Sequence, residues 1–331
     1  MAAPQFVPLD EDAFEYGRVD QVSPLIRRVI AENPSKFTYR GTGTYIVGSG
    51  DVVVIDPGPR LDSHRDFLAK ALDGETVRAI LVTHCHSDHS PLAGWMAEWS
   101  GAPTHAFGSH PRPTEDEVVE DFEDDDEDGD EDGVGETDDG ASGKEVKIEE
   151  ATDYDFAPDV TVADGEVVVE LPGITMAGVH TPGHTSNHMC WTLAEEQALF
   201  TGDHVMGWST TVVSPPDGDM SAYIDSLQKV AGRGDSILWP THGSPREDGA
   251  AYVQALVDHR MEREAGVLDL VRSGVTSIKD MVDILYADVR KELHKPARRS
   301  VWGHLVKLVD DGKVTTAEAG RPVLKSTYVA A

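Results

Sequence analysis

A cluster of three histidines and one aspartate within six residues constrains this chain more than any other feature. The segment 83–90 reads Thr-His-Cys-His-Ser-Asp-His-Ser and directly follows the apolar run 78–82. That run predicts a buried strand, so the polar cluster lies on the loop at the strand's end. Neutral imidazoles and carboxylates are a common ligand set for zinc and similar ions. The cluster therefore predicts a metal site, and it has enough ligands to divide between two adjacent ions: His84, His86, Asp88 and His89.

Length and composition predict one large domain followed by a smaller one. The chain has 331 residues, of which 39% are hydrophobic, enough for a sizeable core. We expect the larger domain over 1–256 and the smaller one over 257–331. The sequence has no basic, apolar leader at its start and no stretch of roughly 18 apolar residues, so we expect a cytoplasmic protein with no membrane contact. Its two cysteines exclude a disulfide framework.

Most of the formal charge of −32 comes from one segment. Residues 115–140 hold seventeen acidic and no basic side chains, which leaves −15 for the rest of the chain. Such a composition cannot bury a core, so we predict a disordered surface insertion at about 112–150. The remaining charge repels a phosphate backbone on average, and binding of nucleic acid would require a local basic patch.

Three later strand-like runs also end on potential ligands. Apolar runs at 174–179, 198–202 and 236–240 lead into Pro-Gly-His-Thr, Gly-Asp-His and Thr-His-Gly. Polar side chains that gather at one edge of a sheet sandwich make a site. The additional candidates are His184, Asp203 and His242.

Other polar residues nearby favour supporting roles. Asp56 lies in an Asp-Pro-Gly turn, where a carboxylate normally accepts backbone hydrogen bonds. Cys85 lies between two candidate ligands and is expected to pack away from the metal. His188 and His204 follow candidate ligands along the chain, and we expect them to support the site rather than bind metal.

These motifs, in this order, resemble the metallo-β-lactamase superfamily, with the likeness covering roughly residues 20–256. The resemblance implies an α+β fold, a four-layer αββα sandwich with the site at one edge of the two sheets. It also implies two metal ions, one held by His84, His86 and His184 and the other by Asp88, His89 and His242. Asp203 would bridge them.

The resemblance implies a binuclear hydrolase. A metal-bridging hydroxide would attack a carbonyl carbon in an ester, thioester, lactone or amide of a small molecule, with Asp88 orienting the nucleophile. Zinc is the leading metal, at two ions per chain. Because the set contains no thiolate, iron or manganese would also fit.

The tail after 256 is helical and then strand-like, which predicts a winged helix. Residues 259–331 contain thirteen Lys and Arg against ten Asp and Glu. A catalytic domain followed by a winged helix resembles the β-lactamase-like protein 2 subgroup, which includes a mitochondrial single-strand endoribonuclease. The segments 201–211 and 259–264 carry that likeness. A basic cluster lies just before or on the third predicted helix: Arg290, Lys291, Lys295, Arg298 and Arg299.

Three functions follow from these features. The first is hydrolysis of a small molecule, with the tail acting as a lid over the active-site mouth or as a contact in a homo-oligomer. The second is cleavage of single-stranded RNA by the same metals, with the basic cluster gripping phosphates. The third is a nucleic-acid-binding regulator whose hydrolase domain only senses a ligand, and the complete ligand set argues against it.

Overall fold

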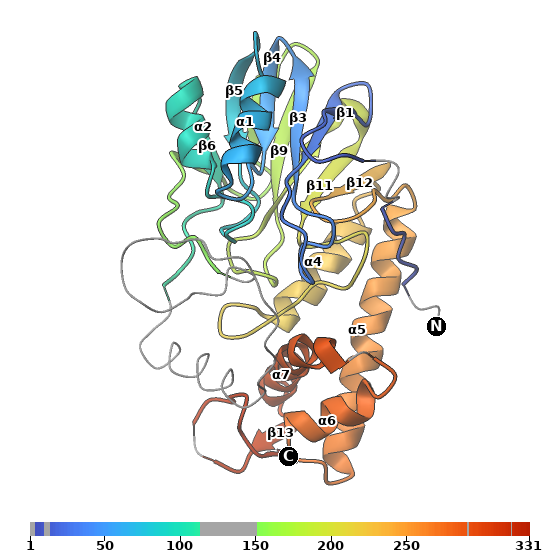
Figure 1. Cartoon of the computed structure of the whole chain (residues 1–331). Helices are drawn as coiled ribbons and strands as arrows, with labels where there is room; N and C mark the ends of the chain where they lie inside the picture. Colours follow the sequence, from blue (N-terminus) through green and yellow to red (C-terminus); the bar gives the residue numbers. More distant parts are fainter. Residues whose placement is uncertain (1–3, 10–13, 113–150, 290, 319) are drawn as a thin grey trace.

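Two facing β-sheets and a helical C-terminal region make up the protein. The computed structural model describes residues 4–9, 14–112, 151–289, 291–318 and 320–331. The predicted insertion, apart from its margins, and Arg290 lie outside this described part. Figure 1 shows the sheets standing against each other, with the C-terminal helices beyond one end of the sandwich.

The first sheet has seven strands, whose order in space follows their order in the sequence. The pairings from β1 to β4 are antiparallel, and those from β4 to β7 are parallel. The strands are β1 (Asp20–Gln21), β2 (Ile26–Ile30), β3 (Gly43–Ser49), β4 (Asp51–Ile55), β5 (Thr76–Leu81), β6 (Thr104–Ala106) and β7 (Val160–Thr161).

The second sheet has five strands in the order β12-β11-β10-β9-β8. Its pairings are antiparallel except for the parallel pair of β11 with β12. The strands are β8 (Val167–Leu171), β9 (Ile174–His180), β10 (Met189–Leu193), β11 (Ala198–Gly202) and β12 (Ile237–Pro240).

Alternating apolar residues let each sheet pack on both of its faces. On β4, Val53 and Ile55 belong to the core between the sheets, together with Trp191 of β10. Val52 and Val54 belong instead to the core on the outer face of the first sheet. Successive residues of a strand point to opposite faces, so one run of β-branched residues serves two layers.

Helices cover both outer faces and complete four layers. On the first sheet lie α1 (Asp62–Ala71) and α2 (Ala93–Ser100), which contribute Leu68 and Met96 to the outer core. On the second sheet lie α4 (Met220–Ala231) and α5 (Gly249–Arg272), which contribute Leu227 and Val253. The αββα arrangement implied by the resemblance is therefore confirmed.

The C-terminal region has its own core. It contains α6 (Ile278–Leu285), the short 3₁₀ helix η4 (Lys291–Leu293), α7 (His294–Asp310) and the antiparallel pair β13 (Val314–Thr316) and β14 (Tyr328–Ala330). Trp302 and Leu305 of α7 and Tyr328 of β14 are buried in this core with Val267 of α5. The C-terminal part of the preceding long helix (Gly249–Arg272), α6 and α7, followed by the two-stranded wing, confirm the predicted winged helix.

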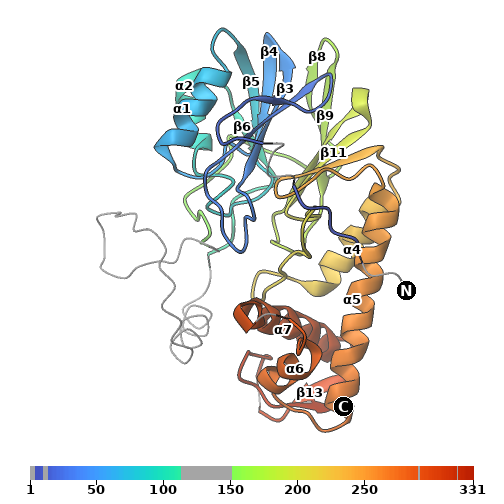
Figure 2. The same ribbon diagram turned by 45° about the vertical axis from the view of Figure 1, so that its right-hand side comes forward.

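Helix α5 connects the two regions without a break. The sequence predicts a helix from about 257, but it begins at Gly249, so it crosses the predicted domain boundary at 256/257. A Cβ at Gly249 would lie 2.9 Å from Leu238 Cγ, which explains a glycine at a position where helix propensity disfavours it. In both views α5 runs from the sandwich to the far end of the winged helix (Figures 1 and 2).

Among the helices that the structure describes, none has both the length and the apolar composition needed to cross a membrane.

Candidate metal centre

The seven predicted ligands converge at one end of the sandwich. They lie on the loops that follow β5, β9, β11 and β12. His84, His89 and His242 are at most 1% exposed, whereas His86, Asp88 and His184 are partly exposed. The site therefore has a buried floor and an accessible rim, as a site that admits substrate requires.

Three imidazole nitrogens form the first group. His86 Nδ1 lies 3.0 Å from His84 Nε2 and 3.1 Å from His184 Nε2. The other ring nitrogens donate outward, His84 Nδ1 to the Thr83 hydroxyl at 3.0 Å and His184 Nδ1 to the Val212 carbonyl at 2.7 Å. Those bonds leave the Nε2 lone pairs of both rings facing the same point, as in a metal site.

One carboxylate and two imidazoles form the second group. Asp88 Oδ2 lies 3.2 Å from His242 Nε2 and 3.3 Å from His89 Nε2. His89 Nδ1 donates to Asp56 Oδ2 at 2.9 Å, and His242 Nδ1 donates to the Gly41 carbonyl at 3.2 Å. Here too, outward hydrogen bonds orient the rings toward a common centre.

Asp203 lies between the two groups. Its Oδ2 is 3.8 Å from His184 Nε2, while its Oδ1 is 3.5 Å from His89 Nε2 and 3.4 Å from His242 Nε2. Ligand atoms of His84, His89 and Asp203 also lie within 4.8 Å of one another, as do those of each group above. The placement matches the bridging position that the resemblance implies.

Two buried atoms test whether the site fits metal ions. Within the described residues, His89 Nε2 and Asp203 Oδ1 make no hydrogen bond, although both are inaccessible to solvent. Orphaned polar atoms are costly in a protein interior. Both point at the centre, and a divalent cation between them would satisfy both. The donor set of nitrogens and carboxylate oxygens therefore fits divalent metal.

Burial and neighbouring charges shift the protonation of these groups. Burial holds the pKa of His84 well below its ordinary value and lowers the pKa of His86 to about 3. Burial acts to lower the pKa of His89 as well, but the Asp88 and Asp203 carboxylates outweigh it and raise the pKa well above its ordinary value. A cation that binds at His89 must displace a proton there, so metal affinity should depend on pH.

Supporting residues surround the ligands. Asp56 accepts hydrogen bonds from the Thr83 N–H at 2.8 Å and the Thr83 hydroxyl at 2.7 Å, in addition to the bond from His89. His188 Nε2 accepts from the Asp203 N–H at 3.2 Å. The Cys85 thiol accepts from Asn187 Nδ2 at 3.0 Å and belongs to none of the three ligand groups, while burial raises its pKa to about 11. These side chains have the non-ligand contacts that the sequence predicts.

Several contacts to the ligands have no signal in the sequence. The Thr42 hydroxyl donates to Asp88 Oδ2 at 2.8 Å, and the carbonyls of Gly41 and Val212 orient two of the histidines. Backbone carbonyls carry no residue-specific pattern, so only the folded loops reveal them.

The predicted basic cluster lies around the start of α7. Lys291 is exposed on η4, and Lys295, Arg298 and Arg299 are half-buried on α7. Helix α7 packs against α4, α5 and α6. Eight of its seventeen residues are buried: Ala297, Ser300, Val301, Trp302, Gly303, His304, Leu305 and Leu308. The other nine, Lys295, Arg298 and Arg299 among them, are partly exposed or exposed. Binding of RNA stays a prediction.

Curated relatives share most of their length with this chain. A thioesterase from Aspergillus chevalieri named atrochrysone carboxyl ACP thioesterase is 29% identical over 309 residues, which is 89% of this chain and 84% of that protein. A protein of the same name from Aspergillus fumigatus is 31% identical over 256 residues, 76% of this chain and 66% of that one. A lactamase-like protein from Aspergillus niger is 26% identical over 316 residues, 89% of this chain and 84% of that one.

Solved structures share the fold. A metallo-β-lactamase family protein from Thermus thermophilus has a TM-score of 0.70 at 20% identity and covers 94% of this chain and 100% of its own. A β-lactamase domain protein from Burkholderia ambifaria has a TM-score of 0.72 at 19% identity, covering 95% and 94%.

Two family models match separate parts of the sequence. The model described as the metallo-beta-lactamase superfamily matches residues 39–242, and the model described as the beta-lactamase associated winged helix domain matches residues 277–321. The first match contains all seven converging side chains and covers more than half of the chain. The chain therefore belongs to the metallo-β-lactamase superfamily and carries its associated winged helix domain.

Proposed function

We propose that this protein is a binuclear metal-dependent hydrolase that cleaves an ester or thioester of a small molecule, with thioesters as the first choice. The observation that carries the proposal is the convergence of seven donor side chains, among which the buried His89 Nε2 and Asp203 Oδ1 make no hydrogen bond within the described residues.

The residues divide into two ligand sets in this proposal. One ion is held by His84, His86 and His184, the other by Asp88, His89 and His242, with Asp203 shared. Zinc is the proposed metal, and iron or manganese would suit the same donors. Bound divalent ions lower the pKa of water at the site and polarise the oxygen of a carbonyl group.

The protein's own groups supply orientation. Asp88 is held by Thr42 at 2.8 Å, so its carboxylate has a fixed direction at the partly exposed rim. His89 and His242 hold the pKa of Asp88 well below its ordinary value against the opposing effect of burial. The carboxylate therefore stays ionised, and it can accept a hydrogen bond from the attacking water and orient it.

The choice of thioesters rests on the relatives. Those that share 84% of their length with this chain include a protein named for thioesterase activity on an acyl carrier protein. The site itself supports the coarser class, because any carbonyl that becomes anionic on attack would be stabilised there.

A substrate panel tests the proposal. Purified protein with measured metal content is assayed against acyl thioesters on coenzyme A and on an acyl carrier protein, and against a lactone, an aryl ester, a β-lactam, a phosphodiester and single-stranded RNA. Release of free thiol from at least one thioester is expected, at about two metal ions per chain.

Two variants make the panel decisive. Asp88→Ala removes the rim carboxylate and should abolish turnover. Asp51→Ala removes an exposed carboxylate whose partner is Arg78 at 2.7 Å, and it should leave turnover unchanged. RNA cleavage that depends on Asp88, without cleavage of any carbonyl substrate, would replace our proposal with a nuclease. Turnover that survives Asp88→Ala would refute the metal mechanism.

A further inference from the structure

A buried arginine joins the winged helix region to a loop of the metal centre. Arg260 lies on α5 and is only 3% exposed. One of its terminal nitrogens donates to the Thr211 carbonyl, and the other donates to Ser300 Oγ of α7 at 3.1 Å. Its guanidinium also lies 5.3 Å from the centroid of the Tyr223 ring. Arg260 therefore contacts three elements that are far apart in the sequence.

The loop that Arg260 contacts holds two of the proposed ligands. The Thr211 hydroxyl donates to the Asp203 carbonyl at 2.6 Å. The next residue, Val212, accepts the hydrogen bond from His184 Nδ1 at 2.7 Å. Asp203 is held from the other side by His188 at its N–H. A shift of the loop at 211–212 would thus move one ligand's backbone and release another ligand's ring.

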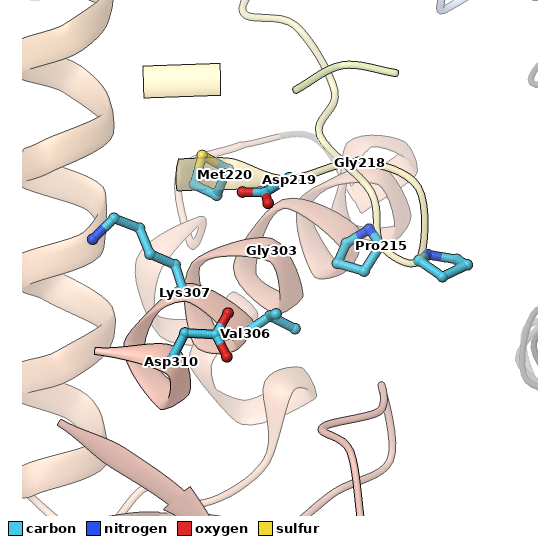
Figure 3. Close-up of a pocket in the computed structure, with 9 residues that line it drawn as sticks. Pro215, Gly218, Asp219, Met220, Gly303, Val306, Lys307 and Asp310 are labelled. Carbon is cyan, nitrogen blue, oxygen red and sulfur yellow. The ribbon is translucent and has the colours of Figure 1, made fainter. Parts of the chain in front are cut away.

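Helix α7 contacts the same loop directly. A Cβ at Gly303 would lie 3.0 Å from the Val213 carbonyl, so a glycine allows this close approach. Beyond it lies a hollow of about 90 Å³ between the turn around Pro215 and one face of α7 (Figure 3). Lys307 at the edge of the hollow donates hydrogen bonds to Glu264 and Asp311, so its ammonium group is already paired within the protein. In Figures 1 and 2 the loop before α4 reaches toward α7.

We propose that Arg260 is a positioning residue for the metal centre, and that the winged helix region acts as a brace for the loop that carries Thr211 and Val212. This inference rests on the proposed metal centre and adds a role for the tail in its assembly. The sequence suggests a lid, a contact in a homo-oligomer or a nucleic-acid module for the tail. The contacts favour a different role, in which the tail holds the loop that orients His184 and Asp203.

The chemistry of the guanidinium suits this role. Its planar fork donates to two acceptors at a fixed separation while a face of the group lies over an aromatic ring. A lysine has one nitrogen and would reach only one of the two acceptors at a time. A methionine fills similar volume and donates to neither. Comparison of arginine with lysine therefore tests the need for two donors at constant charge, and comparison with methionine tests the need for any donor at similar volume.

The test compares the buried Arg260 with the half-buried Arg263 of the same helix. Arg263 bonds to the Leu285 carbonyl at 3.1 Å and lies 4.5 Å from the centroid of the Tyr286 ring, so its partners are all in the winged helix region. We would make Arg260→Met, Arg260→Lys and Arg263→Met in the full chain. The measurements are the dissociation constants for Co²⁺ by chelator competition, the visible spectrum of the cobalt form, and thermal melting of the metal-free chain.

Arg260→Met should weaken binding of at least one ion roughly tenfold and change the cobalt spectrum. Tenfold is the lower end of the loss of metal affinity, about 10–100-fold, that follows removal of a residue supporting a ligand. Arg260→Lys should fall between wild type and Arg260→Met. Arg263→Met should lower the melting temperature but leave both dissociation constants and the spectrum unchanged. If Arg260→Met does not fold, Ser300→Ala gives the second test, because it removes the acceptor of Arg260 on α7 and keeps the arginine; unchanged dissociation constants in that variant would refute the brace.

The possible failures are distinguishable. A wild-type chain that binds no metal refutes the proposed metal centre, and the brace with it. A wild-type chain that binds metal, with affinities unchanged in Arg260→Met or lowered equally in Arg263→Met, refutes the brace alone.

Discussion

Replacing Asp56 with asparagine should weaken both the fold and the metal centre. Asp56 is 1% exposed and has a left-handed backbone with φ of 47°, a conformation that asparagine also tolerates. The substitution therefore changes charge and hydrogen bonding with little change in shape. We expect the effect to come mainly from the bonds that the carboxylate accepts from Thr83 and His89, since its bond from the Thr241 hydroxyl is longer, at 3.4 Å.

The magnitude follows from counting donors. The carboxylate accepts three short hydrogen bonds, with Oδ1 taking the Thr83 N–H and Oδ2 taking the Thr83 hydroxyl and His89 Nδ1. In Asp56→Asn, the side-chain NH2 group would replace either Oδ1 or Oδ2, and in both positions it would face at least one of these donors. Because hydrogen bonds to a charged group contribute about 1.5–3 kcal/mol each, loss of one and weakening of the others should cost about 3 kcal/mol of unfolding free energy.

Urea unfolding of the metal-free chain measures the first effect, and chelator competition measures the second. His89 would lose its orienting partner, so metal affinity should fall by about 10–100-fold. Asp51→Asn is the control, because this carboxylate, at the start of the strand that precedes Asp56, pairs with Arg78 in solvent. An exposed pair contributes only about 0.2–1 kcal/mol. If Asp56→Asn behaves like Asp51→Asn in both measurements, the orienting role of Asp56 is wrong.

Three further predictions concern pH, backbone and metal. Burial lowers the pKa of His64 to about 4, so between pH 6.5 and 4 the unfolded state binds a proton that the folded state does not. As pH falls through this window, the unfolding free energy of the wild type should drop by up to about 3 kcal/mol relative to that of His64→Leu, as measured by urea titration. Unfolding free energies that change with pH in parallel in the two proteins would contradict this. Gly183→Ala places a Cβ 2.3 Å from the Tyr223 Cα at φ of +134°, whereas Gly101→Ala meets nothing within 4 Å at φ of +75°. The first should therefore cost at least about 2 kcal/mol and the second about 1 kcal/mol, and equal melting temperatures would contradict this. Chelation should abolish turnover and lower the melting temperature, and readdition of metal at 100 times its dissociation constant should restore about 2.7 kcal/mol, unless the centre binds no ion.

The sequence predicts the fold and the converging residues well, because both are encoded locally. The consecutive apolar residues at 52–55 specify a strand buried on both faces, and the alternation at 174–178 specifies a strand buried mainly on one face. Four of the seven proposed ligands lie within six residues, so one loop brings them together wherever the strand ends. The other three follow apolar runs, and strand ends are where sandwich sites form. Their role as ligands is a proposal, but their proximity is a property of the structure.

What the sequence does not predict depends on long-range packing. The start of α5 at Gly249 depends on how closely the helix approaches Leu238. The role of Arg260 depends on a carbonyl 49 residues earlier, and the carbonyls of Gly41 and Val212 act through backbone geometry alone. None of these contacts has a periodicity or a spacing that marks it in a linear sequence.

The length of helix α5 determines how the sandwich and the winged helix are oriented relative to each other. It has 24 residues, about 36 Å of continuous helix, with Val253 packed on the sandwich and Val267 in the winged helix core. One residue inserted between these two positions would turn the winged helix by about 100° and advance it by about 1.5 Å. Exchange of the C-terminal region between related chains should therefore succeed only when the number of residues from Val253 to Val267 is kept.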